Sequence, residues 1–239
     1  MPVIALRGIR GATGTTSVAA GLSWALAQLG ENVLAIDFSP DNLLRLHFAM
    51  PFSAPRGWAS AVQAGAGWQH GAMRYSQLLD FLPFGRLADG TQALDSLTDW
   101  RENIAQLKSL SAYHWILLDV PAGESALATQ AVSLADGVFT LLQADAQCHV
   151  RLHQQSLPRH AHYVVNQFVP ASALQQDLLL LWQQSLPNLL PVVLHRDEAM
   201  AESLAALQPV GAFMPHSKIS QELTTLANWC LIHLRNGEQ

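Results

Sequence analysis

Lysine is scarce in this sequence of 239 residues, and its scarcity limits the ligands that the chain can bind. Of the 13 basic residues, only Lys108 and Lys218 are lysines, and the rest are arginines. The formal net charge is −5, and the basic residues form no stripe. Because nucleic-acid phosphates are bound by clustered Lys and Arg, this composition argues against nucleic acid as a ligand.

Cysteine and long apolar runs are also scarce. Cys148 and Cys230 are too few for a disulfide framework, and no Cys-x-x-Cys pair is present. No signal-peptide pattern precedes the first strand-like run, and no apolar stretch reaches the roughly 18–20 residues that a membrane span needs. These absences predict a protein of the reducing cytoplasm with no membrane span of its own.

The chain does contain short apolar runs separated by helical patterns. Helices are expected at 17–29 and 100–110, and strands at 3–6, 33–36, 79–82, 115–118, 138–142, 163–165 and 192–193. Such a pattern is typical of a mostly parallel sheet covered by helices on both faces. We expect an α/β fold of three layers that forms a single domain over residues 1–239.

Residues 50–78 are the least regular part of this pattern. They are rich in Gly, Ala, Pro and Trp and carry no clear periodicity. We interpret them as an insertion after the second strand. Trp58 and Trp68 are the candidates there for a partner surface, because aromatic side chains are enriched in protein interfaces.

Residues 7–17 have the pattern of a phosphate-binding loop. A strand leads into Arg-Gly-Ile-Arg-Gly-Ala-Thr-Gly-Thr-Thr, and a helical pattern follows. Glycines allow the backbone N–H groups to curl around an anion, and the helix N-terminus adds partial positive charge. Gly11 and Gly14 fall where close backbone approach is expected, and the hydroxyl of Thr16 is placed for Mg²⁺. The alternative is an ordinary glycine-rich turn capped by threonines.

Four motifs, in order, resemble those of the MinD/ParA family of P-loop ATPases. The loop is similar to that family's deviant Walker A pattern KGGxGK[ST]. In addition, residues 79–85 echo a further family strand that ends in LPxG. The other matching motifs are residues 33–42 (switch I), 115–123 (Walker B and switch II) and 164–167 (base recognition). The resemblance implies a three-layer P-loop NTPase fold, ATP and Mg²⁺ as ligands, and a homodimer that sandwiches two nucleotides.

The resemblance also assigns roles to particular residues. Asn166 matches the asparagine that reads adenine. Thr16, Asp37 and Asp119 match the magnesium site, the two carboxylates acting possibly through water, and Asp37 is a candidate catalytic residue that positions water. The remaining nucleotide-binding candidates are Arg10, Gly11, Ala12, Thr13, Gly14, Thr15, Ser17 and, after a later strand, Arg151, for which a surface salt bridge is the alternative.

Two departures from the family pattern shape the expected function. Thr15 stands where the family has the P-loop lysine, and Ser39 stands where it has the second switch I aspartate. A hydroxyl supplies no charge to the phosphates, and loss of the carboxylate weakens water positioning. Arg10, on the family's first lysine, is the best-placed substitute cation, in cis or across the dimer. We expect ATP binding with weak or no hydrolysis.

Longer strings are similar to the BcsQ family of bacterial cellulose secretion operons. They are the RGxxGTT loop and residues 40–46, 148–155 and 194–202. The resemblance implies a cytoplasmic regulator of the membrane cellulose synthase that works with BcsR and BcsE. An active ATPase that positions cargo and a nucleotide-free scaffold are the alternatives.

Two further patterns have plain structural interpretations. His149 and His153, one turn apart after Cys148, have metal-ligand spacing but no further ligand cluster. His195 to Glu198 are expected to open the last long helix. Residues 223–234 are apolar on one side but lack a Lys/Arg-rich polar face, so we expect a packed helix and no direct membrane anchor.

Overall fold

The computed structural model describes residues 1–88, 99–158 and 161–235. One eight-stranded sheet runs through it in the order β3-β4-β2-β5-β1-β6-β7-β8, and every neighbouring pair is parallel except β3 and β4. The strands are β1 (Val3–Gly8), β2 (Val33–Asp37), β3 (Met73–Ser76), β4 (Leu79–Leu82), β5 (Trp115–Val120), β6 (Gly137–Leu142), β7 (Ala161–Phe168) and β8 (Leu189–His195).

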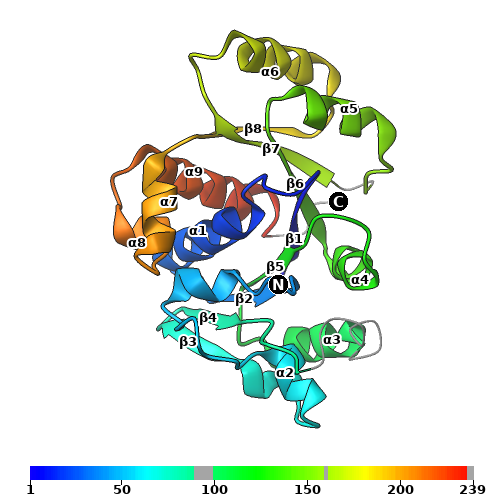
Figure 1. The fold of residues 1–239 in the computed structure, drawn as a ribbon, viewed down its shortest axis with the longest axis vertical. Coiled ribbons are helices and arrows are strands. Elements are labelled where there is room, and N and C mark those ends of the chain that lie inside the picture. The colour runs from blue at the N-terminus through cyan, green and yellow to red at the C-terminus, as the bar shows by residue number, and fades with distance from the viewer. Residues whose placement is uncertain (89–98, 159–160, 236–239) are drawn as a thin grey trace.

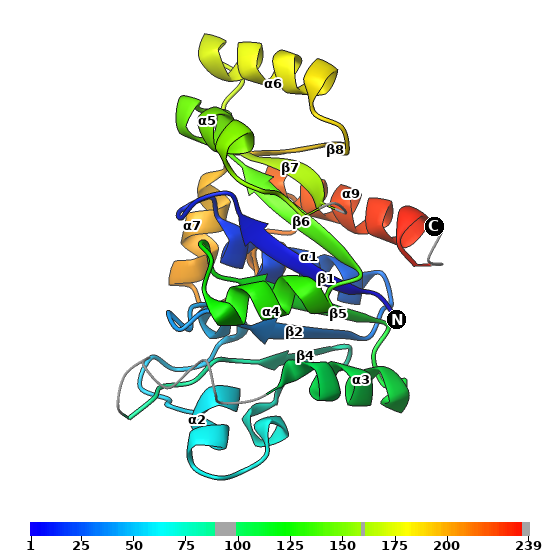
Figure 2. The same ribbon diagram turned by 90° about the vertical axis from the view of Figure 1, so that its right-hand side faces the viewer.

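Helices cover both faces of the sheet (Figures 1 and 2). They are α1 (Thr15–Gln28), α2 (Trp58–Gln63), α3 (Trp100–Leu110), α4 (Ala126–Leu134), α5 (Ala146–Gln154), α6 (Ala173–Ser185), α7 (Glu198–Ala205), α8 (Val210–Phe213) and α9 (Lys218–His233), with short 3₁₀ turns η1 (Leu44–Phe48) and η2 (Trp68–Gly71). The expected mostly parallel sheet with helices on both faces is confirmed.

Alternation along each strand separates the core into layers. On β1, Ile4 and Leu6 point toward α1 and α9, whereas Val3 and Ala5 point toward α3 and α4. Helices α5 and α6 close a third cluster over β6 and β7. Both faces of the central strands are therefore buried in apolar layers, which explains why their sequences are continuous apolar runs.

The structure corrects two expectations from the sequence. Residues 50–78 include the helix α2 and the antiparallel edge strand β3, and Trp58 is fully buried, so its assignment to a partner surface is wrong. Trp68 is half-buried against the same core. Residues 195–197 lead into the short helix α7, which begins at Glu198, whereas the last long helix is α9, which begins at Lys218.

The C-terminal helix packs as expected. Leu223, Leu226 and Cys230 of α9 are buried against α1 and the sheet. In the parts of the chain that the structure describes, no helix combines the length and apolarity needed to cross a membrane.

Candidate nucleotide-binding site

The glycine-rich loop of residues 9–14 lies between the carboxyl end of β1 and the start of α1. Gly14 adopts a left-handed conformation with φ of 83°, and its carbonyl accepts the first helical hydrogen bond from Val18. A Cβ at Gly14 would lie 2.7 Å from Asn166 Nδ2. Glycine is therefore required there by both backbone conformation and packing.

Gly11 and Ala12 lie in different surroundings within the loop. No described atom lies within 4 Å of a Cβ built at Gly11, so the protein itself makes no close approach there. Ala12, which stands on a family glycine, has φ of 62°. An L-residue in the left-handed region costs about 1–2 kcal/mol. The loop thus stores strain at Ala12 and leaves open space beside Gly11.

Side chains from β6 and β7 hold this loop in place. Gln143 Nε2 and Gln167 Nε2 both donate to the Ala12 carbonyl, at 3.3 and 3.4 Å, and Gln143 also donates to Gln167 Oε1 at 2.6 Å. Asn166 Nδ2 donates to the Thr13 carbonyl at 2.7 Å. These bonds occupy the Ala12 and Thr13 carbonyls with partners from the protein, so the anion-binding groups that the loop offers are its main-chain N–H groups.

Arg10 is held within its own subunit. Its guanidinium donates to Gln143 Oε1 and forms an ion pair with Asp145, which also caps α5 through Cys148 N. The hydrogen bond to Asp145 raises the pKa of Arg10 further above its ordinary value. Arg10, the expected substitute for the family's P-loop lysine, is therefore charged and ion-paired with Asp145 in this structure.

Asp37 and Asp119 form a buried carboxylate pair beside the loop. They are aligned across the β2–β5 ladder, and each is at most 2% exposed. Burial raises the pKa of Asp119 to about 7, and a neighbouring Thr16 hydroxyl partly offsets that rise. Burial and then the charge of Asp119 raise the pKa of Asp37 well above its usual range, although N–H groups of Ser39 and Leu44 donate to its carboxylate.

This pair fits a divalent cation. Asp119 Oδ2 is buried and has no hydrogen-bond partner in the described chain, and neither carboxylate forms an ion pair there. Among the described residues no group of three or more His, Cys, Asp and Glu side chains could hold a metal. Mg²⁺ needs fewer protein ligands, because it binds through one or two carboxylates together with water and substrate phosphates. Asp119, Asp37 and the Thr16 hydroxyl are the residues that would hold it.

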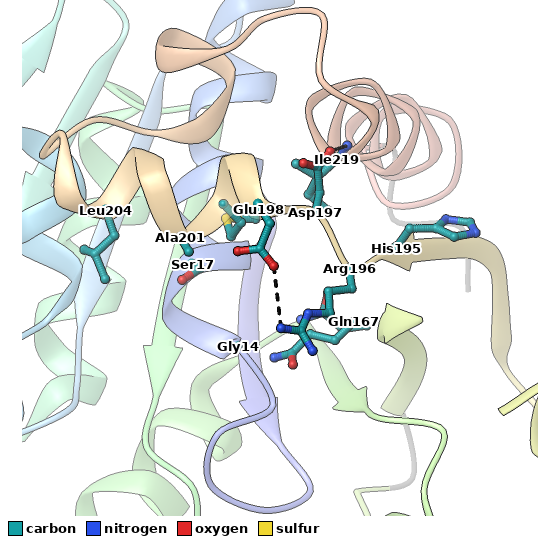
Figure 3. A pocket seen from close by; sticks show the side chains of 12 residues that line it. Gly14, Ser17, Gln167, His195, Arg196, Asp197, Glu198, Ala201, Leu204 and Ile219 are labelled. Atoms are coloured by element: carbon teal, nitrogen blue, oxygen red, sulfur yellow. Dashed lines mark hydrogen bonds and ion pairs between the residues drawn. The ribbon is translucent and has the colours of Figure 1, made fainter. Parts of the chain in front are cut away.

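A cavity of about 360 Å³ lies beside the start of α1. It is lined by Gly14 and Ser17, by Asn166 and Gln167 near the end of β7, and by β8–α7 and α9 residues including His195, Arg196, Asp197, Glu198 and Ile219 (Figure 3). Arg196 and Glu198 face each other at 3.5 Å. Asp197 joins α7 to α9, since its carboxylate accepts from both Ala199 N and Ile219 N.

Most of the predicted site residues meet at this edge of the sheet, with exceptions. Of the predicted site residues, only Gly14, Ser17 and Asn166 line the cavity itself. Arg151 is exposed on α5. Trp182 Nε1 donates to His149 Nδ1, and the His149 and His153 rings are in edge contact. Gln143 and Asp145 are site residues that the sequence reasoning missed, and Gln167 lay in the 164–167 motif but received no role of its own. Their position at the carboxyl ends of β6 and β7, or just beyond them, is the signal that could have found them.

Comparison with known proteins identifies the chain. The profile of the family described as "Cellulose biosynthesis protein BcsQ" matches residues 1–231. The chain belongs to the BcsQ family. The BcsQ proteins of Salmonella typhi and Escherichia coli K12 are 48% and 46% identical to it, each alignment covering 98% of this chain and 95% of the relative.

Solved structures show the same fold as this BcsQ-family chain. MinD in the MinC:MinD complex of Aquifex aeolicus superimposes with a TM-score of 0.79 at 18% identity, covering 100% of this chain and 97% of that one. MinD of Pyrococcus horikoshii, solved with Mg-ADP, gives 0.73 at 22% identity with 98% of each chain covered. The MinD/ParA-like P-loop fold is thereby confirmed.

Proposed function

We propose that residues 1–239 act as one Mg-ATP-binding domain that switches between monomer and ATP-bound homodimer to regulate cellulose synthase. The observation that carries the proposal is the buried pair Asp37 and Asp119, which makes no ion pair in the described chain and lies beside the glycine-rich loop. Two adjacent carboxylates without a cation are electrostatically costly. A bound Mg²⁺ with nucleotide phosphates removes that cost.

Hydrolysis is slow or absent under this proposal. Ser39 carries no carboxylate, its N–H is bound to Asp37, and its hydroxyl oxygen accepts from Asp41 N. The Thr15 hydroxyl lies 3.3 Å from that of Thr13. Neither residue supplies the charge that phosphoryl transfer needs at the attacking water or the leaving phosphate.

The dimer and its partners complete the proposal. In the dimer, Arg10 releases Asp145 and binds the nucleotide of the second subunit, because a guanidinium can donate two parallel hydrogen bonds to phosphate oxygens. The family resemblance extends the proposal to BcsR, BcsE and the membrane synthase as partners, with the protein in the cytoplasm and recruited to the membrane through them. The MinD relative solved in complex with MinC supports partner binding by this fold.

The test is native mass spectrometry of the purified chain with Mg-ATP, with Mg-ADP and without nucleotide. The expected result is a dimer with two intact ATP molecules in the first condition only. Rapid conversion of bound ATP to ADP would favour an active ATPase that positions cargo. A monomer without nucleotide in every condition would overturn the proposal and favour a scaffold.

A further inference from the structure

The segment between switch I and β4 is fixed onto the sheet by contacts that only glycines permit. A Cβ at Gly57 would lie 2.2 Å from Gly85 N, and a Cβ at Gly71 would lie 2.5 Å from Trp58 N. Trp58 N and Ala59 N then donate to the carbonyls of Pro83 and Phe84, each at 2.9 Å. These contacts set the start of α2 directly against the end of β4.

This arrangement places one side chain beneath the candidate magnesium site. Trp58 Nε1 donates to the main-chain carbonyl of Asp37 at 2.8 Å, and the bond is buried. The β2–β4 ladder ends at the pair Ile36 and Leu82, one residue before Asp37. The indole N–H therefore takes the place of a ladder donor at the last residue of β2.

We infer that Trp58 is a positioning residue for the divalent cation, an inference that rests on the proposed function. Its indole N–H fixes the main chain of Asp37, while Ser39 N and Leu44 N fix the carboxylate. Asp37 is thus held at both its carbonyl and its side chain, facing Asp119. Without the indole N–H the buried carbonyl has no donor, and the strand end moves to find one.

The same aromatic cluster supplies a matched control. Trp100 is also fully buried, and its ring lies 5.0 Å from that of Trp58 and 4.9 Å from that of Phe38. Its Nε1 has no hydrogen-bond partner in the described chain. Trp58→Phe and Trp100→Phe therefore remove similar bulk from one core, but only the first removes a hydrogen bond to Asp37.

The experiment measures the nucleotide dissociation constant of each full-length variant with Mg²⁺ and with EDTA, using a fluorescent ATP analogue. The readout is the dissociation constant in EDTA divided by the dissociation constant with Mg²⁺. This ratio isolates the contribution of the cation to nucleotide binding. For Trp58→Phe we expect the ratio to fall about five- to tenfold with the EDTA value unchanged, the size of one lost buried hydrogen bond. Trp100→Phe is expected to keep the parent ratio.

Three results would overturn the inference in distinguishable ways. An unchanged ratio in Trp58→Phe, or equal losses in both variants, removes the positioning role alone. Equal weakening of Trp58→Phe with Mg²⁺ and with EDTA assigns Trp58 to general stability. No Mg²⁺ effect in the parent defeats the proposed function itself. If Trp58→Phe does not fold, benzothienylalanine at position 58 gives the same test, because sulfur replaces the N–H in an isosteric ring.

Discussion

The two sides of the candidate site are built in opposite ways. On the β6–β7 side, the glycine-rich loop is held by one buried side chain, Asn166, and by three partly exposed ones, Gln143, Gln167 and Arg10. It also contains the strained residue Ala12. On the β2–β4 side, Asp37 is held by buried N–H donors from its own loop and from Trp58. Exposed polar contacts exchange readily with ligand or partner, whereas buried ones are costly to break.

This contrast assigns different tasks to the two sides. The carboxylate side is pre-formed, so that a cation meets ligands that are already oriented. The loop side can change conformation, because breaking the partly exposed hydrogen bonds of Arg10, Gln143 and Gln167 costs little free energy. Conformational change on nucleotide binding is therefore expected at residues 10–14, while residues 37–58 stay in place.

Substitution of Arg45 is expected to have the largest effect among the tests of this contrast. Its guanidinium donates to the carbonyls of Asn42, Pro51, Phe52 and Ala54, and the residue is buried. Arg45→Met is expected to lower the free energy of unfolding by about 3 kcal/mol, because four carbonyls lose a charged donor that is itself buried. Urea denaturation measures it. Arg56→Met is the control, since Arg56 makes similar bonds at the surface. Equal losses would contradict a rigid carboxylate side.

Asp119→Asn separates cation binding from stability. We expect the Mg²⁺ enhancement of nucleotide affinity to fall about thirtyfold, because one of the two carboxylates is lost. The nucleotide-free variant should be more stable than the parent at pH 8, by on the order of 2 kcal/mol, because a buried negative charge disappears. Thermal unfolding and nucleotide titration measure the two effects. A variant that loses stability would contradict the electrostatic account.

The pH dependence of the parent gives an independent check of Asp119. Its pKa is raised from 3.8 to about 7 on folding, so the folded state binds the proton more tightly. The contribution of this group to stability is complete below about pH 4 and is lost as pH rises toward 7. Mg²⁺ affinity should instead rise between about pH 6 and 8 as the carboxylate ionises. Asp119→Asn should flatten both profiles.

Asp145→Asn tests the adjustable side. Asparagine keeps the helix cap to Cys148 N but removes the ion pair with Arg10. If Arg10 acts across the dimer, its release should tighten ATP-dependent dimerisation about threefold. Sedimentation with Mg-ATP measures it, and Arg10→Met, which should weaken the dimer, is the control. Weakening by both variants would show that the pair works as a unit within one subunit.

Ala12→Gly gives the smallest expected effect. Glycine relieves the left-handed strain at φ of 62°, at some cost in unfolded-state entropy, and a net stabilisation of about 0.5–1 kcal/mol is expected. Thermal unfolding of the nucleotide-free protein measures it. Ala105→Gly, on the exposed face of α3, is the control and should destabilise by about 1 kcal/mol. Loss of stability in Ala12→Gly would contradict the strain.

The glycine-rich loop and the two carboxylates could be predicted from the sequence, because the motifs that mark them are short. Gly14, Thr16 and the acids that end β2 and β5 lie in short motifs whose conformations follow from neighbouring residues. Trp58 was misread for the opposite reason. An aromatic residue in an irregular glycine-rich segment is easily assigned to the surface. The burial of Trp58 follows from long-range contacts with Pro83, Phe84 and Asp37, which the sequence does not show.

The sequence by itself determined the parallel α/β fold, the loop and the two carboxylates, because strand period, glycine placement and strand-end acids are short-range properties of the chain. Only the tertiary structure decided that Arg10 is latched to Asp145, that Gln143 and Gln167 close the loop, and that Trp58 supports Asp37. These pairs lie from 21 to 155 residues apart in the chain. Their contacts depend on sheet order and side-chain packing, which no local pattern encodes.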